Sequence, residues 1–189
     1  MADSTAENKT KALLANGDKN LVVTDNTKND VSTAAHGFCP KAPNDTAKFL
    51  RGDATWAAPN DGVWTSVTYA SGNFTASGSM TWTVEEADVS NFQYMIIGKT
   101  MWVNFWLALT SVGGTLSDTL KIKIPANKVS ANAIIVRVGF LNDNGTVREG
   151  RVQANAGSTT LDINLHLGGN FAASTNATYV VGQIFFEIQ

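Results

Sequence analysis

The sequence has little of what metal centres, disulfide frameworks and several enzyme classes require. Its 189 residues include one cysteine, Cys39, and two histidines, His36 and His166. A single cysteine leaves no partner for an intrachain disulfide, and these ligands are too few for a zinc cluster. No Gly-x-Ser-x-Gly, phosphate-loop or dinucleotide-binding pattern is present. We therefore expect a non-enzymatic protein that binds no metal and no cofactor.

A charge imbalance and a long apolar run are also missing. The chain has 14 Lys+Arg against 16 Asp+Glu, and residues 1–62 and 63–189 each hold seven basic and eight acidic side chains. This balance provides no basic stripe for nucleic acid. No run reaches the ~18 apolar residues of a membrane span, and the polar first thirty residues lack the core of a secretory signal. We expect a soluble protein and, if it leaves the cell, release by lysis or as part of a particle.

From Val63 onward the apolar residues recur with a period of two, which is typical of half-buried strands. Turn signals separate the runs, and Asn144-Gly145 predicts a hairpin between Ile134–Leu141 and Thr146–Ala154. With about eight to ten such runs and no long helical pattern, the sequence predicts an all-β, antiparallel, jelly-roll-like β-sandwich head over residues 63–189. The clearest alternating runs are Met80–Val84, Leu120–Ile124 and Leu161–Leu167.

Two runs are apolar on both faces. In one, Met101, Val103, Phe105, Leu107 and Leu109 form one face, while Trp102 and Trp106 lie on the other. In the second, Val180, Ile184, Phe186 and Ile188 form one face, and Tyr179, Val181 and Phe185 lie on the other. A sandwich buries one face of each sheet, so the second face needs a cover. We predict that another copy of the chain provides it.

The segment from Ala35 to Ala57 carries a dense pattern that no ordinary helix or strand explains. It reads His36-Gly37-Phe38-Cys39-Pro40-Lys41 and then, after a polar turn, Lys48-Phe49-Leu50-Arg51-Gly52-Asp53-Ala54-Thr55-Trp56. This segment resembles a linker that recurs in bacteriophage tail fibres and related virion fibre proteins. Two positions depart from the pattern. Cys39 replaces an aliphatic residue, and Ala54 replaces a glycine that would take positive φ without strain.

The resemblance implies a homotrimer in which residues 31–62 interlock around a three-fold axis. Because Pro40, Pro43 and Pro59 fix φ and remove backbone donors, we expect this linker to be irregular and extended. Arg51-Gly52-Asp53 spells an integrin-binding tripeptide, which we interpret instead as a turn with an Arg/Asp contact between chains. Three copies of His36 would meet at the axis, where we favour a buried hydrogen-bonding role over a metal or anion site.

The closing run from Tyr179 is similar in pattern to the last strand of trimeric heads of the tumour necrosis factor and C1q families, which also favours a trimer. Residues 1–30 are polar and are expected to attach the chain to other virion proteins. The predicted trimer-interface residues are His36, Phe38, Phe49, Leu50, Arg51, Asp53, Trp56, Trp102, Trp106, Tyr179 and Phe185.

By resemblance, the function is that of a structural fibre or spike protein of a bacteriophage, located in the virion on the tail or capsid surface and contributing to host attachment. Loops on a rigid sandwich are common binding surfaces, and we expect Ser111–Ser117, Leu141–Arg148 and Gly168–Asn176 to contact a host-surface glycan or protein. The candidate receptor-binding residues are Asn142, Asp143, Asn144, Asn170 and Asn176.

Other functions stay open. Within the same class, the chain could be a capsid head fibre or decoration protein without a receptor role. From another class, a lectin-like carbohydrate-binding module would need aromatic side chains lining an exposed pocket, and a carbohydrate-active enzyme would need paired carboxylates in a groove. We interpret Glu85, Glu86 and Asp88 as a solvated turn and His166 as a surface residue.

Overall fold

The computed structural model describes residues 43–59 and 61–189. The chain divides into two compact units, one ending at Pro59 and the other covering Asn60–Gln189. The predicted boundary after residue 62 therefore falls within the second unit. The predicted attachment segment 1–30, together with His36, Phe38 and Cys39, lies outside the described residues.

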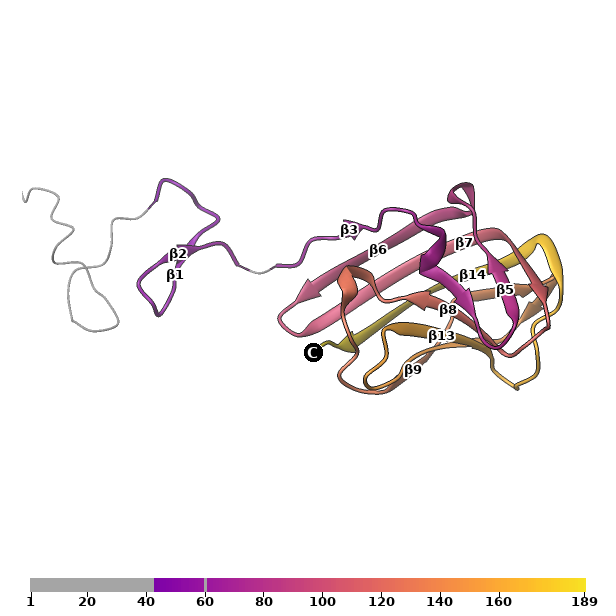
Figure 1. Ribbon diagram of the computed structural model, residues 1–189. Coiled ribbons are helices and arrows are strands. Elements are labelled where there is room, and N and C mark those ends of the chain that lie inside the picture. The colour runs from indigo at the N-terminus through magenta and orange to yellow at the C-terminus, as the bar shows by residue number, and fades with distance from the viewer. Residues whose placement is uncertain (1–42, 60) are drawn as a thin grey trace, which may run out of the picture. The chain divides into compact units, whose positions relative to one another are not determined.

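The second unit, here called the head, is built almost entirely of strands in two facing antiparallel sheets (Figure 1). One sheet has seven strands in the order β11-β10-β14-β7-β6-β3, with β5 also paired to β7. The other has five strands in the order β4-β8-β13-β12-β9. The prediction of an all-β, antiparallel, sandwich-like head is confirmed. Only short 3-10 turns interrupt the strands: η2 (Ser71–Asn73), η3 (Glu86–Asp88) and η4 (Pro125–Asn127).

The strands of the seven-stranded sheet are β3 (Thr65–Ser66), β5 (Met80–Thr83), β6 (Val89–Ile97), β7 (Thr100–Gly114), β10 (Phe140–Asp143), β11 (Thr146–Arg148) and β14 (Ser174–Glu187). Those of the five-stranded sheet are β4 (Phe74–Ala76), β8 (Thr119–Lys123), β9 (Ile134–Arg137), β12 (Gly150–Ala154) and β13 (Thr160–Leu165). The long antiparallel pair of β7 and β14 forms the centre of the larger sheet.

The core lies between the sheets and follows the alternation of the sequence. Met101, Val103, Phe105 and Leu107 of β7 are fully buried, and so is Ile184 of β14. Full burial of a side chain of this size stabilises the fold by roughly 1.5–3 kcal/mol. The inward-facing residues opposite them, on the five-stranded sheet, are Leu120, Ile122, Val152, Leu161 and Ile163.

The alternation fails at Leu109, which was predicted to face the core. Leu109 is 48% exposed and has φ of 60°, because β7 carries one extra residue where its register with β14 shifts. Beyond this bulge, Thr110 and Val112 point inward instead. The buried Thr110 hydroxyl accepts a hydrogen bond from Trp82 Nε1 at 2.9 Å and donates one to the Thr178 carbonyl at 3.0 Å. Three strands are thereby joined at the bulge.

Leu167 was also predicted to be inward, and this is wrong. The strand β13 ends at Leu165, and Leu167 lies in the following turn with 94% exposure. The preceding core positions of the same run, Leu161, Ile163 and Leu165, are buried as predicted.

The hairpin at Asn144-Gly145 is confirmed, but its arms are not continuous strands. Both turn residues have positive φ, at 50° and 80°. Near the turn, β10 pairs with β11 in the seven-stranded sheet, whereas β9 and β12 pair in the five-stranded sheet. The hairpin therefore crosses from one sheet to the other. Gly150 is needed at this crossover, since a Cβ there would lie 2.6 Å from Val138 Cγ2.

The described part of the first unit is a small hairpin rather than the irregular, extended linker that was predicted. Strands β1 (Phe49–Leu50) and β2 (Trp56–Ala57) pair antiparallel. Between them, the Arg51 amide donates to the Thr55 carbonyl at 2.8 Å. Ala54 has φ of 63°, the conformation for which glycine is favoured. The prolines did not prevent the hairpin because none lies between residues 44 and 58.

Candidate functional site

The outer face of the seven-stranded sheet is rich in apolar side chains, and one row of amides, Gln93, Asn104 and Gln183, crosses it. On the central strand pair, Phe185 of β14 lies opposite Trp102 of β7, and their rings are 6.3 Å apart between centroids. Val181 lies opposite Trp106, and β6 adds Met95 opposite Trp102. The register continues this surface to the β10–β11 margin of the sheet. We call it the apolar face; its members are Met95, Ile97, Trp102, Trp106, Phe140, Val147, Tyr179, Val181 and Phe185.

These side chains are open to solvent in a single chain. Trp106 is 52% exposed, Phe185 51% and Val147 66%. Between them the strands present amides, such as Asn104 and Gln183, and the only charged side chain in register with this face is Glu187 at its end. Soluble monomers rarely expose apolar patches of more than a few hundred Å². Depletion of charge together with aromatic enrichment is the composition of a protein–protein interface core.

Four of the predicted interface residues lie on this face: Trp102, Trp106, Tyr179 and Phe185. Sequence reasoning missed Met95, Ile97, Phe140 and Val147. Phe140 and Val147 join the face through the pairing of β10 with β14, which is distant in sequence, whereas Met95 and Ile97 join it through the local β6–β7 hairpin. Val147 reaches the face only because β11 pairs with β10, and Phe140 because β10 pairs with β14.

The remaining described interface predictions lie in the small hairpin of the first unit. Phe49 is 48% exposed, Leu50 pairs with Trp56, and the Trp56 Nε1 atom is buried with no hydrogen-bond partner among the described residues. Arg51 and Asp53 contact each other within one chain, with 3.9 Å between the guanidinium and the carboxylate. Hydrogen bonds from the Thr55 hydroxyl and amide lower the pKa of Asp53.

The three predicted binding loops meet at one end of the head. The Ser111 hydroxyl donates to Asn176 Oδ1 at 3.0 Å, and Asn170 Nδ2 donates to the Leu116 carbonyl at 3.1 Å. The Gly145 amide donates to the Ala177 carbonyl at 3.3 Å. Loops that are far apart in sequence therefore form one surface, which we call the distal end.

The chain enters the head at the opposite end. Gly62 packs against Met95 and Ile97, just before the β6–β7 turn at Gly98. The Ile188 amide donates to the Lys99 carbonyl at 2.8 Å, so the C-terminus lies at this linker end too. Figure 1 shows the C-terminus and the β6–β7 turn at one end of the sheets and the β7–β8 connection at the other. The sequence could not decide which loops are distal, and the structure places all three there.

The candidate receptor-binding residues differ in accessibility. Asn144, Asn170 and Asn176 are exposed at the distal end. Asp143 is only 2% exposed and its carboxylate accepts a hydrogen bond from the Ala172 amide at 2.9 Å, so it anchors a loop instead of facing a ligand. Asn142 lies in β10 opposite Tyr179, on the apolar face rather than in a loop.

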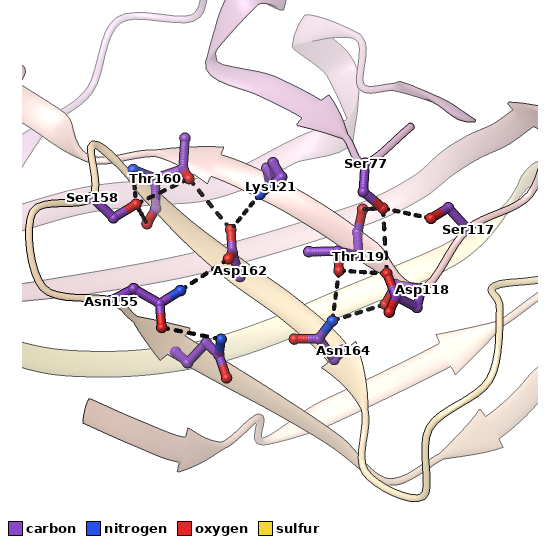
Figure 2. A network of polar contacts seen from close by, with 11 residues as sticks. Ser77, Ser117, Asp118, Thr119, Lys121, Asn155, Ser158, Thr160, Asp162 and Asn164 are labelled. Atoms are coloured by element: carbon purple, nitrogen blue, oxygen red, sulfur yellow. Dashed lines mark hydrogen bonds and ion pairs between the residues drawn. The ribbon is translucent and has the colours of Figure 1, made fainter. Parts of the chain in front are cut away.

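The outer face of the five-stranded sheet is polar, and its side chains bind one another (Figure 2). Lys121 Nζ lies 2.9 Å from Asp162 Oδ1, and Asn164 Nδ2 donates to the Thr119 hydroxyl at 2.7 Å. The Thr119 hydroxyl in turn donates to Asp118 Oδ1 at 2.8 Å, which lowers the pKa of Asp118. The two outer faces thus differ: on this one most polar side chains bind one another, whereas Trp106 and Phe185 of the apolar face are about half exposed in a single chain.

The carboxylates at Glu85, Glu86 and Asp88 form the predicted turn. They lie in and before η3, where the Glu85 amide donates to Asp88 Oδ2 at 2.9 Å, and both glutamates are exposed. His166 is exposed, as predicted. Within residues 43–59 and 61–189, no group of three or more His, Cys, Asp or Glu is arranged to hold a metal ion. In the same ranges, no helix has the length and apolar character needed to cross a membrane.

No protein-family model, no curated protein and no solved structure matches this chain. Function therefore has to be inferred from the surfaces themselves.

Proposed function

We propose that the chain is a structural protein of a bacteriophage particle, a homotrimeric fibre or spike whose heads associate through the apolar face. The observation that carries this proposal is the apolar face itself, with Trp106 and Phe185 each about half exposed in a single chain. A second copy of the same chain removes this surface from water. The resemblance of the linker to those of virion fibres supports three copies and a location in the virion. A jelly-roll type of head is consistent with a trimer and with that location.

The grouping of these aromatic side chains on one face favours a structural over an incidental role. Single exposed apolar residues are common on soluble proteins and need no explanation. Here the exposed side chains Ile97, Trp106 and Phe185 share one face with the half-buried Trp102 and Val181. Burial of such a face stabilises an assembly at roughly 25 cal/mol per Å² of apolar surface.

The location is tested by finding the chain in particles. Antibodies against the head are applied to sedimented virus particles from the cells that produce it, and bound gold is located by electron microscopy. The proposal expects gold at the tail or capsid surface in regular positions. Recovery of all the protein in the particle-free supernatant would overturn it, and a capsid position would favour a head fibre or decoration protein.

A second function, attachment to the host surface, is favoured by the convergence of the three loops at the distal end. A fibre held by its linker presents this end to a target, and the exposed amides of Asn144, Asn170 and Asn176 can hydrogen-bond to sugar hydroxyls. Three heads in one trimer would add avidity of roughly 10²–10⁴ over a single site. The test is to replace each loop separately and measure binding of the labelled protein to intact host cells. If all three variants bind to the cells as the parent does, the proposed role in host attachment is wrong.

A further inference from the structure

All three arginines of the head lie at the point where the hairpin crosses between the sheets. Arg137 ends β9, Arg148 ends β11 and Arg151 lies in β12. Arg137 and Arg151 are direct cross-strand partners. Like charges directly opposite each other destabilise a strand pair, so an anion beside these arginines would stabilise the placement.

The head supplies only one nearby anion. Glu149 lies 3.3 Å from Arg137, but both side chains are more than 60% exposed, at 69% and 65%, and such a pair contributes little. Among the residues that the structure describes, the ion pairs include no carboxylate partner for Arg148 or Arg151. The Arg151 Nε atom is buried and has no hydrogen-bond partner in that part of the chain. Of the three guanidinium groups, only that of Arg137 is paired with a carboxylate in the described part of the chain.

A pocket opens beside two of these arginines, Arg137 and Arg148, whereas Arg151 is not part of its lining. Its volume is about 220 Å³, and its lining combines Arg137, Arg148 and Glu149 with the apolar side chains of Phe140 and Val147. A second hollow of about 180 Å³ shares Val147, Arg148 and Glu149 with this lining and adds Leu165, Leu167 and Gly168. Pockets for drug-sized ligands run to roughly 300–1,000 Å³, so the crossover pocket has the size for one small polar unit.

The lining points to a ligand with an anionic group and a ring. A guanidinium binds a carboxylate through two parallel N–H donors, a geometry that lysine does not offer. Phe140 is 41% exposed and Val147 66%, which leaves apolar surface against which a ring can pack. The Glu149 carboxylate can accept hydrogen bonds from hydroxyl groups, and its negative charge disfavours a doubly charged phosphate more than a singly charged carboxylate.

We propose that the crossover pocket binds an acidic sugar, a hexuronic or sialic acid unit, with its carboxylate between Arg148 and Arg137 and its ring against Phe140 and Val147. Phe140 and Val147 also belong to the apolar face, at its β10–β11 margin, so the proposal requires that the assembly leaves this margin uncovered. The inference does not depend on a location in the virion. If the host-attachment role is correct, the pocket identifies carboxylated surface polysaccharide as the ligand class.

The test is a ligand-observed NMR titration of the full-length protein with glucuronate, N-acetylneuraminate, neutral glucose and acetate. The proposal expects at least one acidic sugar to bind more tightly than glucose and acetate by about tenfold. Arg148→Gln should weaken that binding by about 10- to 100-fold, because it removes a hydrogen-bonded charge partner. Lys123→Gln, which removes an exposed cation outside the pocket lining, should bind as the parent does.

Three results would overturn the proposal. Equal binding of glucose would show that the carboxylate is not recognised, and equal binding of acetate would show an anion site only. Equal weakening in Arg148→Gln and Lys123→Gln would indicate a general charge effect. The assembly proposal is judged separately, by molecular mass and particle labelling.

Discussion

Removing Trp106 and Phe185 from the apolar face should dissociate the assembly without unfolding the head. The double substitution Trp106→Ser, Phe185→Ser replaces side chains that are 52% and 51% exposed in a single chain. A buried aromatic side chain covers about 150–250 Å², so roughly 100 Å² of each remains for an interface. At ~25 cal/mol per Å², that area is worth roughly 2–3 kcal/mol for each side chain.

The two losses together reach roughly 5 kcal/mol per chain, which corresponds to a factor of about 10³–10⁴ in an association constant. The assay is light scattering behind size exclusion at several protein concentrations, with thermal melting as the check on folding. The matched control is Ile135→Ser, Leu167→Ser, which removes apolar side chains that are 60% and 94% exposed but lie outside the apolar face. The control should keep the parental mass.

Three outcomes are informative. Dissociation of the Trp106/Phe185 variant alone supports assembly through the apolar face. An unchanged mass for this variant would refute the reasoning, since it would place the interface elsewhere. Dissociation of both variants would mean that any loss of exposed apolar area weakens the assembly, and the face would lose its special role.

Other predictions concern stability and local structure. Thr110→Val should lower the free energy of unfolding by about 1–3 kcal/mol, because Trp82 Nε1 loses its hydrogen-bond acceptor. Thr110→Ser keeps the hydroxyl and is the control. If the valine variant unfolds in urea with the same free energy as the parent, this prediction is wrong. Ala54→Gly should relieve about 1 kcal/mol of left-handed strain and slow hydrogen exchange of the Arg51 amide, and unchanged exchange would argue against strain. The hydrogen bond from Thr119 lowers the pKa of Asp118 in the folded state. The ionised carboxylate therefore stabilises the head at pH values above the ordinary aspartate pKa of about 4. This stabilisation is lost as the pH falls through the pKa of the folded state. Asp118→Asn should therefore melt below the parent at about pH 6 and approach it at about pH 3, and a pH-independent difference would exclude this linkage.

Alternation along the chain was sufficient to predict the strands and most of the core. Met101 to Leu107 and Val180 to Ile188 bury the side chains that their period of two assigns to the inside. Leu109 could not be predicted, because the bulge that exposes it is held by hydrogen bonds from Trp82 to Thr110 and from Thr110 to β14. Those partners are 28 and 68 residues away in sequence. Local pattern carries no information about such a contact.

The surfaces were predicted less well than the strands. Trp102 and Phe185 were found because each lies in a run that is apolar on both faces, whereas Phe140 and Val147 join the same face only through the pairing of β10 with β11 and β14. The arginine cluster was missed for the same reason, since Arg137 and Arg151 become neighbours only through the register of β9 with β12. Residue type identified the candidates, but register decides which of them meet.

The mass of the full-length protein in solution tests the central claim most directly. Light scattering behind size exclusion measures it without reference to a standard, and dilution shows whether the species is stable. The account predicts three times the chain mass of 20.1 kDa, maintained on dilution to micromolar concentration. A stable species of 20.1 kDa would show that the apolar face is tolerated in water by a single chain, and the proposal of a trimeric fibre would be wrong.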